Sequence, residues 1–153
     1  MRQRLLLWCG LLVLLQQGTF AAPAIKNDPI KMEMARLEGA WRVLAYSKSG
    51  VAKSDEDLKD YPRFIVKDGE YQWENTAAKG KIVRIDPTAK PKEIDFEFTD
   101  ENNQAVREFG IYEIDGDTYR DCIAPNGQAR PKEFTTTARN GYTMMTSKRD
   151  QRK

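Results

Sequence analysis

The hydrophobic positions near residue 30 follow a helical period. Three of them recur at i, i+4 and i+7, namely Ile30, Met34 and Leu37, and they form a narrow apolar stripe. Asp28 is a favoured N-cap, Pro29 suits the first helical position and Gly39 favours termination. The pattern predicts a short helix over residues 28–38. Because so short a helix is marginal alone, we expect the stripe to dock on the end of a barrel or sandwich.

After Gly39 the helical period gives way to alternation of every second residue, which is typical of a strand. The alternation predicts two faces, one with Trp41, Val43 and Ala45 and the other with Arg42, Leu44 and Tyr46. Ser54 to Leu58 resembles a capping box, with Asp57 where Glu is usual. We therefore expect a single helical turn between the first two strands.

The rest of the chain is predicted as short strands separated by strong turn signals. The strand-like runs cover residues 63–67, 71–75, 81–86, 93–98, 105–114, 117–124, 132–137 and 142–149. Asp68-Gly69 and Asp115-Gly116 favour tight hairpin turns, and the last two runs are expected to pair across residues 139–141. About eight antiparallel strands joined by short loops predict a small up-and-down barrel. A β-sandwich is the alternative.

One predicted strand, residues 93–98, carries acidic side chains along one face. Two sets alternate within it, Ile94, Phe96 and Phe98 against Glu93, Asp95 and Glu97. This alternation indicates one buried face and one solvated face. We therefore expect the three carboxylates to be exposed and not to form a calcium site or a glycosidase pair.

The first 22 residues have the layout of a secretory signal peptide. Basic residues precede an apolar run from Leu5 to Leu15, and small residues around Ala22 offer a cleavage site. The run is too short to span a bilayer as a helix, which needs about 20 residues. We expect residues 1–22 to be removed and residues 28–153 to form one exported domain, periplasmic or extracellular, without stable membrane insertion. An uncleaved anchor is the alternative.

The composition disfavours several classes of function. The chain has no histidine, the commonest general base and metal ligand. Loss of Arg2 and Arg4 would reduce the 25 basic residues to the number of acidic ones, 23, so no positive excess remains to bind nucleic acid. Cys9 lies in the predicted signal peptide, and Cys122, left alone, is expected to be a buried small hydrophobic residue. We expect no enzyme activity, no catalytic residue, no cofactor and no metal site.

A set of short motifs appears in a fixed order along the chain. The motifs are Leu37-Glu38-Gly39-Ala40-Trp41, Ile85-Asp86-Pro87, Lys90-Pro91-Lys92, Ile94-Asp95-Phe96, residues 110–118, Cys122-Ile123-Ala124-Pro125 and Arg130-Pro131-Lys132-Glu133-Phe134. This ordered set, over residues 37–149, resembles a family of lipocalin-like domains found mostly in planctomycete bacteria. The resemblance implies a lipocalin-like barrel, often exported, with no established activity.

In lipocalins generally, a Gly-x-Trp motif in the first strand plugs one barrel end. A basic residue near the end of the last strand lies over the Trp ring. Gly39 and Trp41 match the motif, and Lys148 or Arg149 could supply the cation. The resemblance therefore implies a structural role for these residues, with a cation–π contact worth about 0.5–2 kcal/mol.

The hairpin around Asp115-Gly116 predicts which side chains point inward. A two-residue turn there places three pairs opposite each other: Ile114 and Asp117, Tyr112 and Tyr119, Gly110 and Asp121. Because the other members of this face are mostly apolar, the face is expected to be interior, and an inward carboxylate must then be paired, hydrogen-bonded or wet. The functional hypothesis is that Asp121, with Tyr112 and Tyr119, holds a polar group of a ligand. Alternatively, Asp121 pairs with an Arg or Lys, or a bulge turns it outward.

The segment from Arg130 to Phe134 is predicted as the entry to a strand, with Phe134 inward. Arg130 is expected to pair with an acidic residue at a barrel mouth.

Two functions remain open. The first is an exported barrel that binds a small hydrophobic or amphipathic molecule. The second is a structural or interaction domain of the cell envelope with a filled core, for which no protein partner can be named.

Overall fold

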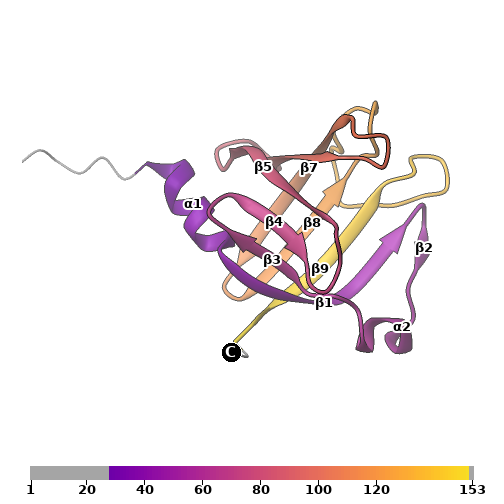
Figure 1. The fold of residues 1–153 in the computed structure, drawn as a ribbon. Coiled ribbons are helices and arrows are strands. Elements are labelled where there is room, and N and C mark those ends of the chain that lie inside the picture. Colours follow the sequence, from indigo (N-terminus) through magenta and orange to yellow (C-terminus); the bar gives the residue numbers. More distant parts are fainter. Residues whose placement is uncertain (1–27, 152–153) are drawn as a thin grey trace, which may run out of the picture.

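The computed structural model describes residues 28–151 of the protein (Figure 1). The signal peptide predicted for residues 1–22 lies outside the described residues, as do the last two residues of the predicted domain. Neither helix in the described part of the chain is long and apolar enough to cross a membrane.

Eight antiparallel strands form a closed barrel, and one further short strand extends it. The strands are β1 (Gly39–Lys48), β2 (Val51–Ala52), β3 (Phe64–Lys67), β4 (Glu70–Trp73), β5 (Lys79–Asp86), β6 (Lys92–Thr99), β7 (Ala105–Asp115), β8 (Thr118–Ile123) and β9 (Thr143–Asp150). Their order around the barrel follows the chain, and β1 pairs with β9 to close the ring, while β2 extends the sheet beside β1. The predicted up-and-down barrel is confirmed, and the sandwich alternative is wrong.

Helix α1 (Pro29–Leu37) covers one end of the barrel, which we call the closed end. The Asp28 side chain accepts a hydrogen bond from the Ile30 amide at 3.0 Å, as expected for an N-cap. The helix stops before Gly39, whose φ of +120° suits glycine far better than other residues. Leu37 is fully buried, and its carbonyl accepts a hydrogen bond from Trp41 Nε1 at 2.8 Å. The predicted helix is confirmed, although Ile30 stays half exposed.

Helix α2 (Asp55–Lys59) is the single helical turn predicted between the first strands. Ser54 Oγ accepts a hydrogen bond from the Asp57 amide, and Asp57 Oδ2 accepts one from the Ser54 amide, both at 3.2 Å. The predicted capping box is therefore confirmed. Leu58 is buried in the hydrophobic core, so this short helix is held by packing as well as by its cap.

Aromatic rings fill the centre of the barrel. Trp41 is fully buried, and its ring centroid lies 5.6 Å from that of Tyr119. Phe64 stacks on Tyr119 with a centroid separation of 6.1 Å. Apolar side chains from the alternating positions of the strands complete this core, namely Val43, Val66, Ile85, Ile94, Ile114 and Met145. Each such burial is worth about 1.5–3 kcal/mol.

A bulge in β1 changes the face on which its side chains lie. The register with β9 shifts between Val43 and Ala45, so Leu44 is the extra residue and is 41% exposed. Beyond the bulge, Tyr46 packs against the core and Ala45 is exposed. The predicted faces are therefore correct as far as Val43 and wrong for Ala45 and Tyr46, because one inserted residue reverses the alternation.

The hairpin between β7 and β8 has a different register from the predicted one. The observed pairs are Ile114 with Tyr119, Tyr112 with Asp121, and Gly110 with Ile123. The predicted pairs are thus wrong by two residues. Because the side-chain period of a strand is two residues, a shift of two leaves every side chain on its predicted face. Tyr112, Tyr119 and Asp121 consequently still share the inner face.

Residues 124–142, which we call the outer strap, connect β8 to β9 along the outside of the barrel. The strand predicted over 132–137 is not formed. Both edges of β8 and of β9 are already paired within the closed ring, so no edge is free for a further strand. The strap covers Cys122, whose Sγ donates to the Thr135 carbonyl at 3.7 Å. Cys122 is fully buried as expected, and burial raises the pKa of its thiol to about 11.

Candidate functional site

The end of the barrel opposite α1, which we call the open end, holds a pocket of about 280 Å3. It lies where β1, β4 and β8 end and where β3 and β9 begin. Its lining residues are mostly aromatic or apolar, with two acidic residues and one lysine: Tyr46, Lys48, Tyr61, Phe64, Tyr71, Trp73, Phe96, Glu108, Asp121, Ile123, Ala124, Pro125, Gly141, Thr143 and Met145. The outer strap contributes Ala124, Pro125 and Gly141 to this lining, so both ends of the strap border the pocket.

Three aromatic rings stand in contact on one side of this pocket. The centroids of Tyr46 and Tyr61 are 5.5 Å apart, and Tyr61 meets Trp73 edge-on at 5.8 Å. The ammonium group of Lys53 lies 5.4 Å from the Tyr61 centroid and 5.9 Å from the Tyr46 centroid. The faces of aromatic rings carry negative potential. This wall can therefore hold either an apolar body or a positive charge.

Asp121 reaches the pocket from β8 and is only 4% exposed. Its Oδ2 accepts a hydrogen bond from the Tyr119 hydroxyl at 2.8 Å, and its carboxyl also accepts from the Met145 amide. Burial raises its pKa to about 7, an effect that the two donors oppose and that nearby Glu108 increases. Neither alternative for Asp121 occurs, because the side chain faces inward and no Lys or Arg of the described residues forms an ion pair with it.

Glu108 is the second carboxylate of the pocket. It points inward from β7, opposite Phe96 on β6. Burial raises the pKa of its carboxyl, and the positive charge of Lys48 opposes that rise. Lys48 itself is exposed at the rim. The acidic groups therefore lie in the wall of the pocket, whereas its lysine lies at the entrance.

The structure separates the three residues that the hairpin pattern grouped together. Asp121 lines the pocket. Tyr119 lies behind it, fully buried, and holds the Asp121 carboxyl through its hydroxyl. Tyr112 points to the closed end, where its hydroxyl donates to Glu33 Oε1 at 3.2 Å. Asp121 is therefore the only one of the three that lines the pocket, and Tyr119 supports it from behind.

One further residue of the pocket could have been found by the same alternation, and two could not. Glu108 is two residues before Gly110 on the predicted inner face, so its inward direction follows from the pattern. Tyr46 and Lys48 face the pocket only because of the bulge at Leu44. No turn residue or spacing in the sequence marks that bulge.

The closed end contains the Gly-x-Trp plug. Arg149, not Lys148, lies over Trp41, with its guanidinium carbon 4.2 Å from the ring centroid. Its nitrogens donate to the carbonyls of Glu38 at 2.5 Å and Arg36 at 2.6 Å. Lys148 is the strand neighbour of Arg42 in the register of β1 with β9, and both side chains lie on the opposite face of the strands. Arg149 therefore ties the end of α1 to β9, a structural role.

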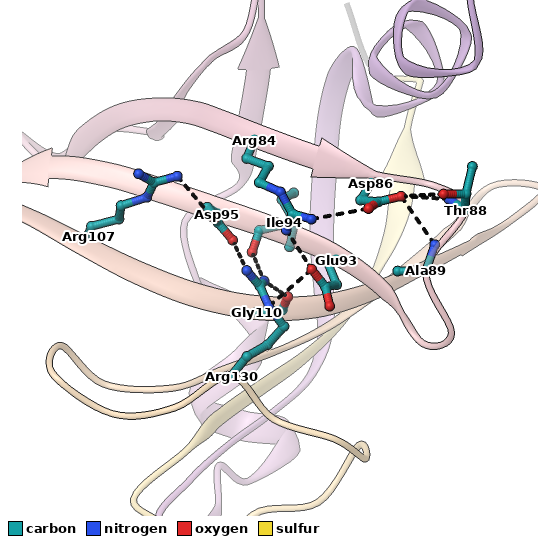
Figure 2. Close-up of polar contacts among 10 residues, drawn as sticks. All are labelled: Arg84, Asp86, Thr88, Ala89, Glu93, Ile94, Asp95, Arg107, Gly110 and Arg130. Carbon is teal, nitrogen blue, oxygen red and sulfur yellow. Dashed lines mark hydrogen bonds and ion pairs between the residues drawn. The ribbon is translucent and has the colours of Figure 1, made fainter.

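Charged side chains form an extended network on the outer wall (Figure 2). Asp95 of β6 binds Arg130 of the outer strap at 2.5 Å and Arg107 of β7 at 2.9 Å. Glu93 binds Arg84 at 2.5 Å and Arg130 at 3.4 Å. One nitrogen of Arg130 also donates to the Gly110 carbonyl at 2.6 Å. This network fastens the strap to the barrel.

The network and the strap correct three predictions. Asp95 was expected on a solvated face, but it is only 2% exposed because Arg130 and the strap cover it. Arg130 does pair with acidic residues, but on the outer wall of β6 and β7 and not at a barrel mouth. Phe134 is not inward either, since it lies outside the barrel with the Arg120 guanidinium 4.3 Å from its ring centroid. The common cause is that the segment is a strap and not a strand.

The described residues offer a second hollow but no grouped metal ligands. Within residues 28–151, no three Cys, Asp or Glu side chains are grouped as metal ligands. A larger groove of about 820 Å3 lies along β3 to β6, and its lining includes three lysines, Lys67, Lys79 and Lys81, and three acidic residues, Asp68, Glu70 and Glu97. Its charges of both signs are mostly exposed, so it lacks the buried polar groups that distinguish the pocket.

Comparison of the sequence with protein-family models found no matching family, and comparisons with curated proteins and with solved structures found no significant match. The resemblance to lipocalin-like domains of planctomycete bacteria therefore stays a prediction. The barrel itself rests on the strand pairing described above.

Proposed function

We propose that this protein binds a small hydrophobic or amphipathic molecule in the open end of its barrel, and that it does so after export from the cell. The observation that carries the proposal is the pocket of about 280 Å3, with an aromatic wall, the buried carboxyl of Asp121 and the half-buried carboxyl of Glu108. Small-molecule sites combine these features, usually in volumes of roughly 300–1,000 Å3. The pocket is close to the lower limit, which favours a compact ligand. We propose binding without catalysis, because the chain lacks histidine.

The uneven packing of the interior supports this proposal over a purely structural role. A structural domain with a filled core has no reason to keep carboxyl groups beside an open volume, because each buried charge costs stability unless it is paired. The closed half of the barrel is filled by Trp41, Tyr119 and the residues around them. The open half keeps both the volume and the two carboxyls.

A fluorescent probe can test the proposal. N-phenyl-1-naphthylamine is neutral, apolar and brighter in apolar surroundings, so we expect saturable enhancement with the purified protein. Thr143→Trp, at the pocket wall, should abolish the enhancement by filling the volume. Thr146→Trp is the matched control, since Thr146 lies on the same strand and pairs with Ala45, which is exposed. It should keep the enhancement.

Native mass spectrometry of the protein from the organism that produces it is the second arm. A bound molecule should appear as extra mass that is lost on denaturation, and Thr143→Trp should lack it. If the probe does not bind and no extra mass is seen, the binding proposal is wrong and the structural alternative is favoured.

A further inference from the structure

The charges of the pocket are arranged unevenly in depth. Asp121 and Glu108 lie in its wall, and Asp121 is almost fully buried. Lys48 lies at the rim and is exposed, and Lys53, whose ammonium lies over Tyr46 and Tyr61, is exposed as well. Charges in water are strongly screened, whereas charges away from water act strongly on a bound group. A ligand that enters the pocket therefore meets mainly the field of the two carboxylates.

Asp121 has hydrogen-bond donors that stabilise its ionised form, although burial and Glu108 oppose that form. The carboxyl accepts two hydrogen bonds, one from the Tyr119 hydroxyl and one from the Met145 amide. Both donors stabilise a carboxylate. Among the described residues, no cation lies within ion-pair distance of it, and Glu108 adds a second negative charge nearby. What this site lacks is a positive group.

The aromatic wall is suited to the same kind of group. A cation within about 6 Å of an aromatic ring centroid is attracted by the ring face. The ammonium of Lys53 already takes such a position over Tyr46 and Tyr61. Trp73, which meets Tyr61 edge-on, and Phe64 extend the wall into the pocket. Aromatic faces and carboxylates thus both favour positive charge.

We propose that the pocket selects an organic cation, namely a compact aromatic or aliphatic body that carries a protonated amine, with the amine held by Glu108 and Asp121. This inference rests on the proposed binding function and names its ligand class. The apolar body packs against Phe64, Trp73 and Phe96. An anionic ligand would have to place its charge near the exposed lysines and away from the two carboxylates. It would therefore bind less tightly in the pocket.

Three probes of similar size and different charge test this proposal. They are 2-phenylethylamine, a cation, 2-phenylethanol, its neutral analogue, and 3-phenylpropionate, an anion. Isothermal titration at pH 8 compares their dissociation constants with the purified protein. We expect the amine to bind about 10- to 100-fold more tightly than the alcohol, the range for a charged hydrogen bond shielded from water, and the anion to bind most weakly.

Substitution of one pocket carboxylate should remove this preference. In Glu108→Gln, the ratio of alcohol to amine dissociation constants should fall by about tenfold or more. Glu113→Gln is the matched control, since Glu113 lies on the same strand but on the outer face, where it pairs with Arg120; its ratio should stay unchanged. Asp121→Asn is the second variant, and thermal melting establishes that each protein is folded.

The outcomes separate this proposal from the general one. Equal affinities for amine and alcohol, or tighter binding of the anion, overturn the choice of a cation and leave a binding barrel. If none of the three probes binds while N-phenyl-1-naphthylamine does, the choice of a cation is likewise overturned and a binding barrel is left. If the neutral dye also fails, both proposals fall. An unchanged ratio in both Glu108→Gln and Asp121→Asn would show that the carboxylates do not select the charge.

Discussion

The two ends of the barrel each bury a carboxyl group beside a tyrosine hydroxyl, with opposite electrostatic results. At the closed end, Glu33 accepts from Tyr112 at 3.2 Å and pairs with Lys92 at 2.5 Å and Arg36 at 3.0 Å. Burial alone would raise the pKa of Glu33, but the hydrogen bond and charge of Lys92, with the charge of Arg36, lower it overall. At the open end, burial dominates and raises the pKa of Asp121 to about 7.

The contrast separates what stabilises the fold from what it leaves available. Helix α1 supplies the closed end with Glu33 and Arg36 and with the carbonyls that receive Arg149. Each of these charges has a partner of opposite sign or a matching dipole. At the open end, no element of the described residues supplies a cation to Asp121. Departures from full pairing tend to lie at functional sites, which is why the open end carries the proposals.

The largest expected difference between the ends concerns their tryptophans. Trp41→Ala should lower the free energy of unfolding by about 3–5 kcal/mol, because it removes a fully buried ring and its bond to Leu37. Trp73→Ala, at the half-buried open end, should cost less. Urea unfolding measures both. A Trp41→Ala protein as stable as the wild type would refute the plug.

The next largest effect is the pH dependence of Asp121. Its folded-state pKa is above its ordinary value, so its contribution to stability is fully present below pH 3.8 and is lost as the pH rises to about 7. The stability of Asp121→Asn relative to the wild type should therefore rise between pH 4 and pH 8. The expected rise in the difference between their free energies of unfolding is about 4 kcal/mol. Burial raises the pKa of Asp121, Glu108 raises it further, and the hydrogen bonds from Tyr119 and the Met145 amide oppose the rise. Unfolding curves at both pH values test this, with Asp115→Asn, at the exposed end of β7, as the control.

Removal of the arginine at the closed end should have an intermediate effect. Arg149→Ala loses the contact with Trp41 and the bonds to two carbonyls of α1, and it should cost about 3 kcal/mol. Lys148→Ala should stay within about 0.5 kcal/mol of the wild type, as for an exposed residue. Thermal denaturation compares the two. Equal losses would mean that the cation–π pair has been assigned to the wrong residue.

The smallest effect should come from Glu33, with a sign opposite to that of Asp121. Because the folded-state pKa of Glu33 is lowered, its stabilising contribution is present above pH 4.5 and is lost as the pH falls through the folded-state pKa. Glu33→Gln should cost about 1–2 kcal/mol at pH 7 and less at pH 3. If Glu33→Gln and Asp121→Asn changed stability in the same direction at pH 8, the contrast between the ends would be wrong.

Much of the fold could be predicted because it depends on local patterns. The hairpin at Asp68-Gly69 forms as expected, with φ of 52° at Asp68 and 78° at Gly69. The alternation around Asp121 identified the correct face even though the hairpin register was wrong by two residues. A local signal of period two is insensitive to that error.

The remaining errors arise where distant segments meet. The bulge at Leu44 lies where β1 pairs with β9, and it brings Tyr46 and Lys48 to the pocket. Asp95 is buried only because Arg130, far along the chain, reaches it from the strap. The position of Tyr112 at the closed end depends on α1 docking there. None of these contacts has a counterpart in local spacing.

Alternation, turn residues and the helix cap were sufficient to determine an all-β meander with a short leading helix, because each is decided by neighbours in the sequence. Closure of that meander was decided only in three dimensions. It left 132–137 without an edge to pair with, placed α1 over one end and left the pocket at the other. Whether a buried carboxyl finds a cation depends on which distant side chains share its surroundings. The tertiary structure therefore decided that Glu33 forms ion pairs with Lys92 and Arg36, whereas Asp121 has no such partner among the described residues.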